Sequence, residues 1–347
     1  MEITMRKIKW GVIACGGIAD RRTLPGMMLS DKAELVAVMD VNPDFAEKCK
    51  VKYGAKYAFT NYEDLLALDE IEAVYIASPV FCHKEQALAA AKAGKHILLE
   101  KPMGLTVADS KDIIAACVTA GVKLGVGFMM RFHAYHQAIK QVIAEGKIGE
   151  IVSMRAQFTC WYPEIENCWR QDKTLSGGGA LMDMGIHCID LLQYLSGLEA
   201  VECVGFAQHQ TFNYTADDSA SVLMKMNNGA LAYVDANFNI PDAAAKCPLE
   251  FYGTKGSIVA IGTLSQVEGG TVEILACPEA KGYDAQQDRS LVEPVTLDVE
   301  FGNMYTKELD AFADAIINDT TPPVNGSNTI SVQKIIESVY RSNGGKL

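Results

Sequence analysis

Three side chains in this sequence have the type and placement needed to move a proton, and the first of them is a lysine. Lys101 stands in the run Glu100-Lys101-Pro102, directly after an apolar segment that is typical of a buried strand. In open α/β sheets, ligands lie beyond the carboxyl ends of the strands, so we expect this lysine beside a bound ligand. Burial and nearby positive charge lower the pKa of a lysine, which makes its amine a usable proton donor or acceptor. The alternative is a surface lysine before a turn proline.

The other two are Asp183 and His187, which follow the glycine run 177–179. Their four-residue spacing predicts that the carboxylate and the imidazole share one face of a helix, one turn apart. Such a pair can grip a hydroxyl group and move its proton. The alternative is a polar pair covering a surface helix. That alternative explains the three glycines poorly, because glycine weakens a helix start that binds no ligand.

A second glycine-rich segment, near the start of the chain, is typical of a phosphate-binding turn. The run from Ala14 to Ala19 fits the pattern G-x-G-x-x-G/A, with Ala14 in place of the first glycine. Gly16 would let the backbone approach a pyrophosphate, and Ala19 would allow close packing of helix on strand. The helix that begins near Gly17 and Ile18 would direct its N–H groups at the phosphates. An ordinary tight turn is the alternative.

An acidic residue at the end of the second predicted strand supports the phosphate-binding interpretation. The dinucleotide fingerprint places such a residue about 20 positions beyond the glycines, and Asp40 stands there. Its carboxylate would hydrogen-bond the ribose hydroxyls and repel a 2′-phosphate, and no lysine or arginine follows it directly. We therefore expect NAD as the cofactor, with NADP less favoured. Arg21 and Arg22 are the main argument for NADP, with solvated surface positions as their alternative role.

The elements that must position these residues differ between the two parts of the chain. Residues 1–127 alternate short apolar runs with helical patterns, which predicts a parallel sheet with right-handed crossovers: a Rossmann dinucleotide-binding domain. Residues 128–347 contain mostly extended segments, and Asn227-Asn228-Gly229 is a strong hairpin signal. We expect an α+β domain with a large, mostly antiparallel, open-faced sheet that serves substrate binding and oligomerisation.

The predicted elements can be given by residue range. In the first part, strands are expected at 8–14, 35–39, 58–60, 73–77, 96–100 and 123–127, and helices at 18–30, 43–53, 62–67, 83–93 and 106–120. In the second part, strands are expected at 151–161, 200–210, 218–226, 230–238, 249–252, 257–261 and 271–275. Helices are expected there at 135–145, 180–195, 301–318 and 329–342, and a polar loop at 278–291.

The composition argues against several classes of partner. The chain has 347 residues, and its 31 basic and 43 acidic residues give a formal net charge of −12. A negative surface argues against nucleic acid and anionic membranes as partners. No run of about 18 apolar residues exists, so we expect no membrane span. The ten cysteines contain no C-x-x-C pair, which favours reduced thiols and a cytoplasmic protein.

Taken together, the motifs resemble the Gfo/Idh/MocA family, the glucose–fructose oxidoreductase and inositol dehydrogenase group. The resemblance covers most of the chain, and the combination of motifs is specific although each motif alone is not. The residues that carry it are Gly16, Asp40, Ala77-Ser78-Pro79 with His83, Glu100-Lys101-Pro102, Arg131, the run 146–150, and the segment from Gly177 to His187. Ala14 departs from the commonest glycine pattern of the family.

The resemblance implies roles for these residues. It places Lys101 and His187 in the active site, makes Asp183 a residue that binds or orients substrate, and implies a cis peptide bond before Pro102. The implied cofactor-binding residues are Gly16, Gly17, Ile18, Asp40, Ser78, Pro79, His83, Glu100 and Lys101. The candidate substrate-binding residues are Arg131, Trp169, Arg170, Asp183 and His187. It further implies a homodimer or homotetramer formed through the sheet of the second domain.

Two further groups of residues could bind a ligand: the segment before the glycine run, and a pair of histidines near position 135. Trp161, Tyr162, Trp169 and Arg170 could form a wall on which a sugar stacks, but core packing is an equal alternative for the tryptophans. His133 and His136 have the spacing of weak metal ligands. No carboxylate or cysteine stands near them in the sequence, so we expect no metal.

The expected reaction is hydride transfer between nicotinamide and a secondary hydroxyl of a sugar, cyclitol or related polyol, bound between the two domains. His187 or Lys101 would take the hydroxyl proton, while the protein supplies position and charge. A second hypothesis is a redox-neutral reaction, such as glycoside cleavage, in which tightly held NAD is reduced and reoxidised in each cycle. A third is a non-catalytic sensor of a sugar or cofactor.

Overall fold

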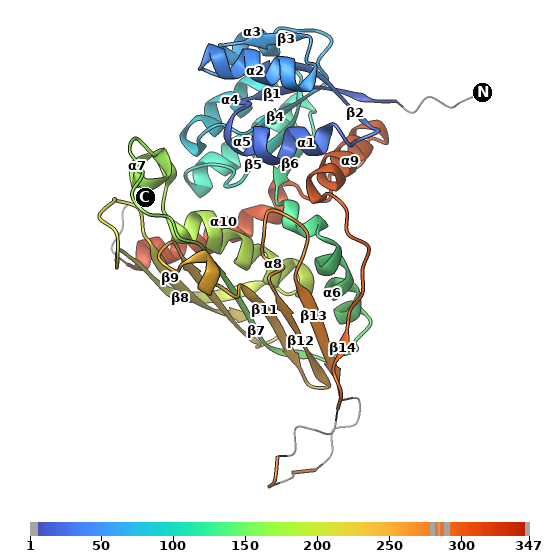
Figure 1. Ribbon diagram of the computed structural model, residues 1–347, viewed down its shortest axis with the longest axis vertical. Helices are drawn as coiled ribbons and strands as arrows, with labels where there is room; N and C mark the ends of the chain where they lie inside the picture. Colours follow the sequence, from blue (N-terminus) through green and yellow to red (C-terminus); the bar gives the residue numbers. More distant parts are fainter. Residues whose placement is uncertain (1–5, 278–281, 284, 288–291, 344–347) are drawn as a thin grey trace, which may run out of the picture. The chain divides into compact units, whose positions relative to one another are not determined.

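Within the residues that the computed structural model describes (6–277, 282–283, 285–287 and 292–343), six parallel strands form the first sheet (Figure 1). Their order is β3-β2-β1-β4-β5-β6. The strands are β1 (Ile8–Ile13), β2 (Ala33–Met39), β3 (Tyr57–Phe59), β4 (Ala73–Ile76), β5 (His96–Glu100) and β6 (Leu124–Gly127). This order confirms the predicted Rossmann fold, in which ligands bind where the order reverses between β1 and β4.

Several helices of this sheet begin at side chains that accept hydrogen bonds from their first backbone N–H groups. The Asn42 side chain accepts from the N–H groups of Asp44 and Phe45, and Thr106 and Asp109 form a reciprocal capping box. The helices are α2 (Pro43–Tyr53), α3 (Tyr62–Leu66), α4 (Val80–Lys92) and α5 (Val107–Ala120). Each lies within a few residues of its prediction, because caps and glycine stops are local signals.

The helix expected at 18–30 is different. It begins as a π-helical turn, η1 (Ala19–Thr23), and continues as the short helix α1 (Leu24–Met27). Pro25 lies at the start of α1 and has no N–H group, and its ring crowds the carbonyl group four residues earlier. The wider turn before it avoids this conflict, which a uniform helical pattern does not represent.

The C-terminal part of the chain corrects the predicted domain limits of 1–127 and 128–347. The first compact unit contains Met1–Met129, Leu175–Gly177 and also Asn303–Gln333. Helix α9 (Met304–Ile317) belongs to it because Leu309, Phe312 and Ala313 are buried in the same core cluster as residues of the Rossmann sheet. The Phe312 ring lies 5.7 Å from the ring of Trp10 on β1.

The second unit (Met130–Thr174, Gly178–Gly302 and Lys334–Leu347) contains the larger sheet. Its strand order is β14-β13-β12-β11-β7-β10-β9-β8, and the neighbours pair antiparallel except β7 and β10, which are parallel. The strands are β7 (Ile151–Thr159), β8 (Ala200–Gln208), β9 (Ser219–Met226), β10 (Leu231–Asn237), β11 (Pro248–Gly253), β12 (Gly256–Ile261), β13 (Thr271–Ala276) and β14 (Val295–Thr296). The predicted hairpin at Asn227–Gly229 is confirmed: Asn228 accepts from the Ala230 N–H, and Gly229 has a φ of 91°.

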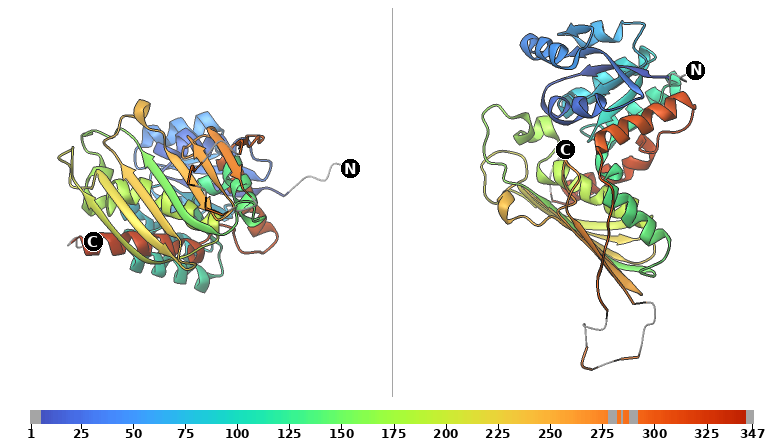
Figure 2. Two further views of the ribbon diagram at one scale, coloured as in Figure 1. Left: turned by 90° about the horizontal axis from the view of Figure 1, so that it is seen from below. Right: turned by 45° about the vertical axis from the view of Figure 1, so that its right-hand side comes forward.

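Helices cover one face of this second sheet. They are α6 (Ala134–Ala144), α8 (Ile186–Ser196) and the C-terminal half of α10 (Gly326–Ser342), which Figure 1 and the right-hand view of Figure 2 place on the same side of the strands. The left-hand view of Figure 2 faces the opposite side, where the strands lie in front. Alternate residues of β9 and β10 are buried on the helical side, as expected for a sheet with one covered face.

Two sequence expectations meet the structure only in part. The polar loop expected at 278–291 lies mostly outside the described residues, and the short edge strand β14 beyond it was not expected.

All ten cysteines lie within the described residues and are free thiols. In the portion of the chain that is described, no helix combines the length and the apolar character needed to span a membrane.

Candidate active site

The dinucleotide turn is held by a hydrogen bond between two strand ends. Asp40 follows β2, and its carboxylate accepts from the backbone N–H of Gly16 at 3.2 Å and from that of Asn42 at 3.0 Å. The Gly16 turn follows β1 directly, and β1 and β2 are adjacent parallel strands. Gly16 and Asp40, each predicted to contact the cofactor, are therefore also in direct contact with each other, at the edge of the sheet where the fold binds ligands.

The backbone of this turn fits a dinucleotide. Gly17 has a φ of 54°, and an added Cβ there would meet no atom within 4 Å, so the space before the turn is open. Behind the turn, Ala19 is fully buried against the sheet. The turn η1 then presents a helix start to that open space, with Ile18 at its cap position, where backbone N–H groups favour an anion.

Ala14 stands where the usual pattern has its first glycine, and it adopts the backbone conformation of that glycine. Its φ is 62°, in the left-handed region that favours glycine. The chain thus keeps the backbone shape of the fingerprint and carries the strain of an alanine there, which is about 1–2 kcal/mol.

A buried histidine links the loops that follow the next two strands, β4 and β5. His83 on α4 is 1% exposed, and its two ring nitrogens lie 2.8 Å from the Pro102 carbonyl oxygen and 2.9 Å from that of Ser78. The Ser78 hydroxyl donates to the Gln86 side chain at 2.6 Å, and Pro79 begins α4. This buried ring therefore joins the loops after β4 and β5, and the cofactor contact predicted for His83 stays a prediction.

Lys101 follows β5, and Glu100, the last residue of that strand, is held by a chain of hydrogen bonds from two hydroxyl groups. The Tyr75 hydroxyl donates to Glu100 at 2.5 Å, and the Thr23 hydroxyl donates to Tyr75 at 2.9 Å. The other carboxylate oxygen of Glu100 accepts from the Lys101 N–H at 3.2 Å. Burial raises the pKa of Tyr75 well above its usual value, and Glu100 adds to the effect, so Tyr75 stays a donor. The expected cis peptide bond between Lys101 and Pro102 is present.

The acid–imidazole pair lies at a change of helix type in the second unit. Asp183 is in a π-helical turn, η4 (Leu181–Gly185), and His187 is in α8. The predicted shared face assumed a uniform α-helix, whereas a π-turn has i→i+5 hydrogen bonds and alters the angular spacing. His187 is 4% exposed, with its ring 6.2 Å from that of Phe158. Burial and, after it, the nearby Asp183 carboxylate together raise the pKa of Cys160 to about 12.

The glycine run, which the sequence suggested would face a ligand, packs closely against other parts of the protein. A Cβ on Gly179 would lie 1.8 Å from the Asp217 carbonyl oxygen, and one on Gly178 would lie 2.1 Å from the Tyr340 hydroxyl oxygen. The sequence analysis missed Asp217 and Tyr340. The only sequence signal was the pair Asp217-Asp218 before a half-buried strand, where two adjacent carboxylates need local donors.

Arg131 is engaged with the helix that carries His187. Its Nε donates to the two Asp190 oxygens at 2.9 and 3.2 Å, and its Nη2 donates to Oδ1 at 2.5 Å. Arg131 is 5% exposed and Asp190 1%. This buried, bidentate pair favours a role in positioning α8 over the predicted direct contact with substrate.

The segment 160–172 is organised by a glutamine that the sequence analysis also missed. Gln171 accepts from the Ile165 N–H at 2.8 Å and donates to the Pro163 carbonyl at 2.6 Å. Next to it, the Arg170 guanidinium stacks 4.4 Å from the Trp169 ring, and both are partly exposed. These two predicted substrate contacts therefore lie together as one partly exposed surface.

Comparison with known proteins decides the family. Residues 8–128 match the oxidoreductase family with an NAD-binding Rossmann fold, and residues 136–259 match the GFO/IDH/MocA C-terminal domain. The chain belongs to the Gfo/Idh/MocA family of oxidoreductases. The first unit is accordingly a domain that binds a nicotinamide cofactor, and the resemblance seen in the motifs is confirmed.

Several known proteins align with nearly the whole chain. A 1,5-anhydro-D-fructose reductase from Ensifer adhaerens is 27% identical over 93% of this chain and 92% of its own length. A 3-ketoreductase from Actinomadura kijaniata, solved with NADP and TDP-benzene, is 25% identical with a TM-score of 0.83 and covers 97% of this chain and 98% of its own. A levoglucosan dehydrogenase, solved with NADH and levoglucosan, has a TM-score of 0.85 over 98% of both chains; at 23% identity it shows the fold.

The buried histidine at the strand ends makes the first unit sensitive to acid. Burial lowers the pKa of His83 to about 4, against 6.5 when the chain is unfolded. Unfolding therefore takes up a proton between these two values, so stability is full above pH 6.5 and falls as the pH drops toward 4. We expect the free energy of unfolding to fall in this window by a few kcal/mol, at about 1.4 kcal/mol per pKa unit.

Urea unfolding tests this dependence when it is measured from about pH 7.5 to about pH 4.5, in steps of about half a pH unit. His83→Gln should show a shallower loss of stability with acid than the parent chain. The exposed His209 offers a matched control, and His209→Gln should keep the parental slope. An unchanged slope in His83→Gln would show that this ring is not the acid-sensitive group.

Proposed function

We propose that this chain transfers hydride between NAD and a secondary hydroxyl of a sugar, cyclitol or related polyol. The observation that carries the proposal is the hydrogen bond between Asp40 and the Gly16 N–H, which builds a dinucleotide turn in a member of an oxidoreductase family. The choice of substrate class is supported by the names of the relatives, which include a reductase of an anhydro-sugar and a dehydrogenase of levoglucosan.

The protein residues would handle the proton and the orientation of the substrate. The nicotinamide, when bound, supplies the hydride acceptor or donor. Lys101 would place its amine at the edge of the first sheet, and a lysine among protein charges can hold or release a proton at its Nζ. His187 would exchange the hydroxyl proton through its ring, and Asp183 would accept a hydrogen bond from a neighbouring hydroxyl. The Trp169–Arg170 surface offers a stacking face for the carbon skeleton.

The proposal names NAD as the preferred cofactor because of the charge at the end of β2. A carboxylate accepts hydrogen bonds from the ribose hydroxyls and repels a phosphate at the 2′ position. Asp40 already accepts two backbone N–H groups, so its orientation is set before any cofactor binds. The preference is not general among similar folds, since the 3-ketoreductase from Actinomadura kijaniata was solved with NADP.

The reaction is tested by incubating the purified chain with NAD and a panel of sugars and inositols while NADH absorbance is followed. Steady accumulation of NADH is the expected result. Lys101→Ala and His187→Ala should each lower turnover about a hundredfold or more with NAD affinity nearly unchanged, because they remove proton transfer rather than the dinucleotide turn.

Matched surface variants separate this effect from general damage. Lys147→Ala and His209→Ala remove the same side-chain types at exposed positions and should keep parental turnover. Product formation without NADH accumulation would instead favour the redox-neutral reaction. Binding without product would favour the sensor, and parental activity in both Lys101→Ala and His187→Ala would refute the assigned roles.

The cofactor preference is tested at Asp40 itself. Asp40→Asn keeps an oxygen that can accept the Gly16 N–H but removes the negative charge. We expect the ratio of kcat/KM for NAD to that for NADP to fall about tenfold or more, since repulsion of the 2′-phosphate is lost. Asp44→Asn, an exposed acid in the first turn of α2, is the control and should leave the ratio within about twofold. A parental ratio in Asp40→Asn contradicts the proposal.

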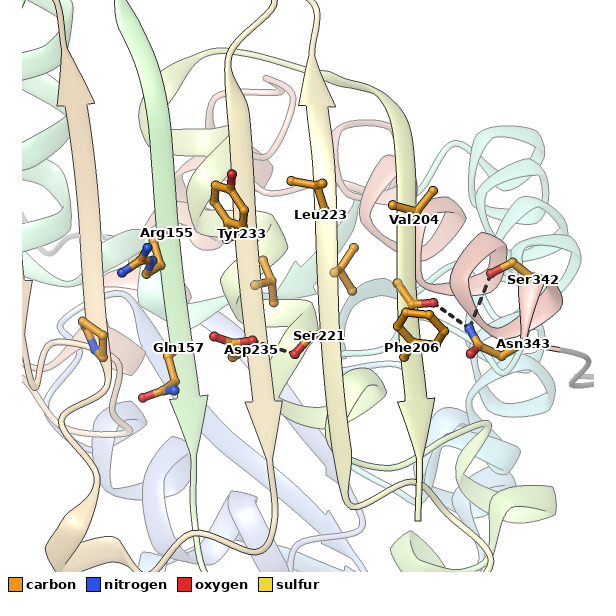
Figure 3. A pocket seen from close by; sticks show the side chains of 14 residues that line it. Arg155, Gln157, Val204, Phe206, Ser221, Leu223, Tyr233, Asp235, Ser342 and Asn343 are labelled. Carbon is orange, nitrogen blue, oxygen red and sulfur yellow. Dashed lines mark hydrogen bonds between the residues drawn. The ribbon is translucent and has the colours of Figure 1, made fainter. Parts of the chain in front are cut away.

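For the partner, we propose that a second copy of this chain covers the open face of the larger sheet. Figure 3 shows side chains of β7, β8, β9 and β10 on this face. They line a hollow of about 930 Å³. Phe206 is 73% exposed, Val204 64% and Tyr233 39%. A face this apolar is typical of an interaction surface. Arg155 and Asp235 stand on the same face (Figure 3), so two copies related by a two-fold axis could set opposite charges against each other.

The oligomer is tested by light scattering across a range of concentrations. We expect the parent chain to be a dimer or tetramer. Phe206→Glu should raise the dissociation constant of this assembly at least about tenfold, because a charge would be buried in the contact. Val118→Glu is the control: Val118 is 76% exposed on α5 of the other unit, and its change should leave the assembly intact. A monomeric parent chain, or an oligomer unaffected by Phe206→Glu, contradicts this proposal.

A further inference from the structure

One carboxylate residue collects three consecutive backbone N–H groups at the end of the glycine run. The Gly179 N–H donates to Asp217 Oδ1 at 2.7 Å, the Ala180 N–H to the Asp217 carbonyl at 2.8 Å, and the Leu181 N–H to Asp217 Oδ2 at 3.0 Å. Neither η4 nor α8 has a side-chain cap of its own. Asp217, 36 to 38 positions away in the sequence, therefore caps the start of this helical segment.

A second residue holds this cap in place from another part of the chain. The Tyr340 hydroxyl on α10 donates to Asp217 Oδ1 at 2.7 Å, and both residues are 5% exposed or less. Burial raises the pKa of Tyr340 well above its usual value, and Asp217 adds to this, so the phenol stays protonated and donates. Glycines at 178 and 179 are required, because a Cβ at either position would overlap Tyr340 or Asp217.

The capped peptide is joined directly to the acid of the active site. Gly179 donates its N–H to Asp217 and accepts, through its carbonyl, the N–H of Asp183 at 2.9 Å. The position of Asp217 thus sets the first hydrogen bonds of η4, the turn that carries Asp183 and leads into His187. A shift of this start by one hydrogen bond would rotate both side chains about the helix axis.

We propose that Asp217, anchored by Tyr340, is a positioning residue for the chemistry of Asp183 and His187. The inference rests on the proposed function, since it assigns these two side chains to substrate. Asp217 acts through the backbone: its negative charge and its fixed acceptors select the π-helical start, and the active-site side chains follow from that start.

The neighbouring residue provides a matched control. Asp218 is fully buried, and its carboxylate accepts three backbone N–H groups, from Gln210, Thr211 and Phe212 at 2.7–2.9 Å, where the carboxylate of Asp217 accepts two. It organises the loop before β9 instead of η4. A change of Asp218 to asparagine therefore removes the same chemical group at the same depth, without touching the start of the helix.

The experiment compares Asp217→Asn, Tyr340→Phe and Asp218→Asn in the full chain. For Asp217→Asn we expect kcat with the best polyol of the panel to fall about 10–100-fold, since small displacements of reacting groups are costly, with NAD affinity within about twofold. Tyr340→Phe removes one of the four hydrogen bonds and should lower kcat less, by about 3–10-fold. Asp218→Asn should reduce thermal stability comparably to Asp217→Asn and keep kcat within about threefold.

A readout independent of turnover separates this proposal from the proposed function. The chain has six histidines, so the ring signals of a histidine-labelled sample can be assigned with His187→Gln. The His187 signal and its titration should change in Asp217→Asn and Tyr340→Phe but not in Asp218→Asn. If the parent chain oxidises no polyol, the proposed reaction fails while this test still applies.

Three results would overturn the positioning role. They are parental kcat in Asp217→Asn, an equal loss of kcat in Asp218→Asn, and a His187 signal that is the same in all three variants. If Asp217→Asn does not fold, Tyr340→Phe decides the question by the same measurements, because it removes only a hydroxyl group.

Discussion

The structure depends on how the first backbone N–H groups of two helical segments are satisfied. In each unit a carboxylate from a distant segment accepts the N–H of a glycine: Asp40 accepts from Gly16, and Asp217 accepts from Gly179. A buried N–H group without an acceptor costs about 1–3 kcal/mol. The approach of the carboxylate requires a residue with little or no side chain. In both places the glycine and the acidic residue therefore depend on each other, although 24 and 38 positions separate them in the sequence.

Both of these segments begin as π-helical turns, and in the first unit the crowding by Pro25 also favours the wider turn. The turns η1 and η4 start within a few residues of the bonded glycine, before the helices α1 and α8. A π-turn is uncommon in soluble proteins and is often found at functional sites, because it re-aims side chains at a local cost. In this chain the cost is offset by charged acceptors from outside the helix. The glycine run 178–179 is accordingly a well-packed part of the fold, and the buried pair of Arg131 and Asp190 adds a further restraint on α8.

Much of the fold could be predicted, because its signals are short-ranged. The strand at 96–100 and the helix at 43–53 match β5 and α2 at both ends, since an apolar run, an Asn-Pro start and a following Gly54 define them locally. Helix α9 was also predicted as a helix, but its apolar face does not say which core it enters. Its assignment to the second domain was therefore wrong.

By itself, the sequence determined the two halves, the dinucleotide turn with Asp40, and the candidates Lys101, Asp183 and His187, because residue type, periodicity and spacing express these features locally. Only the tertiary structure decided that His83 joins two loops, that Arg131 binds Asp190, and that the glycine run closes on Asp217 and Tyr340. The physical reason is that a buried donor or acceptor finds its partner through space. Which of many distant polar groups becomes that partner is set by the packing of the whole unit.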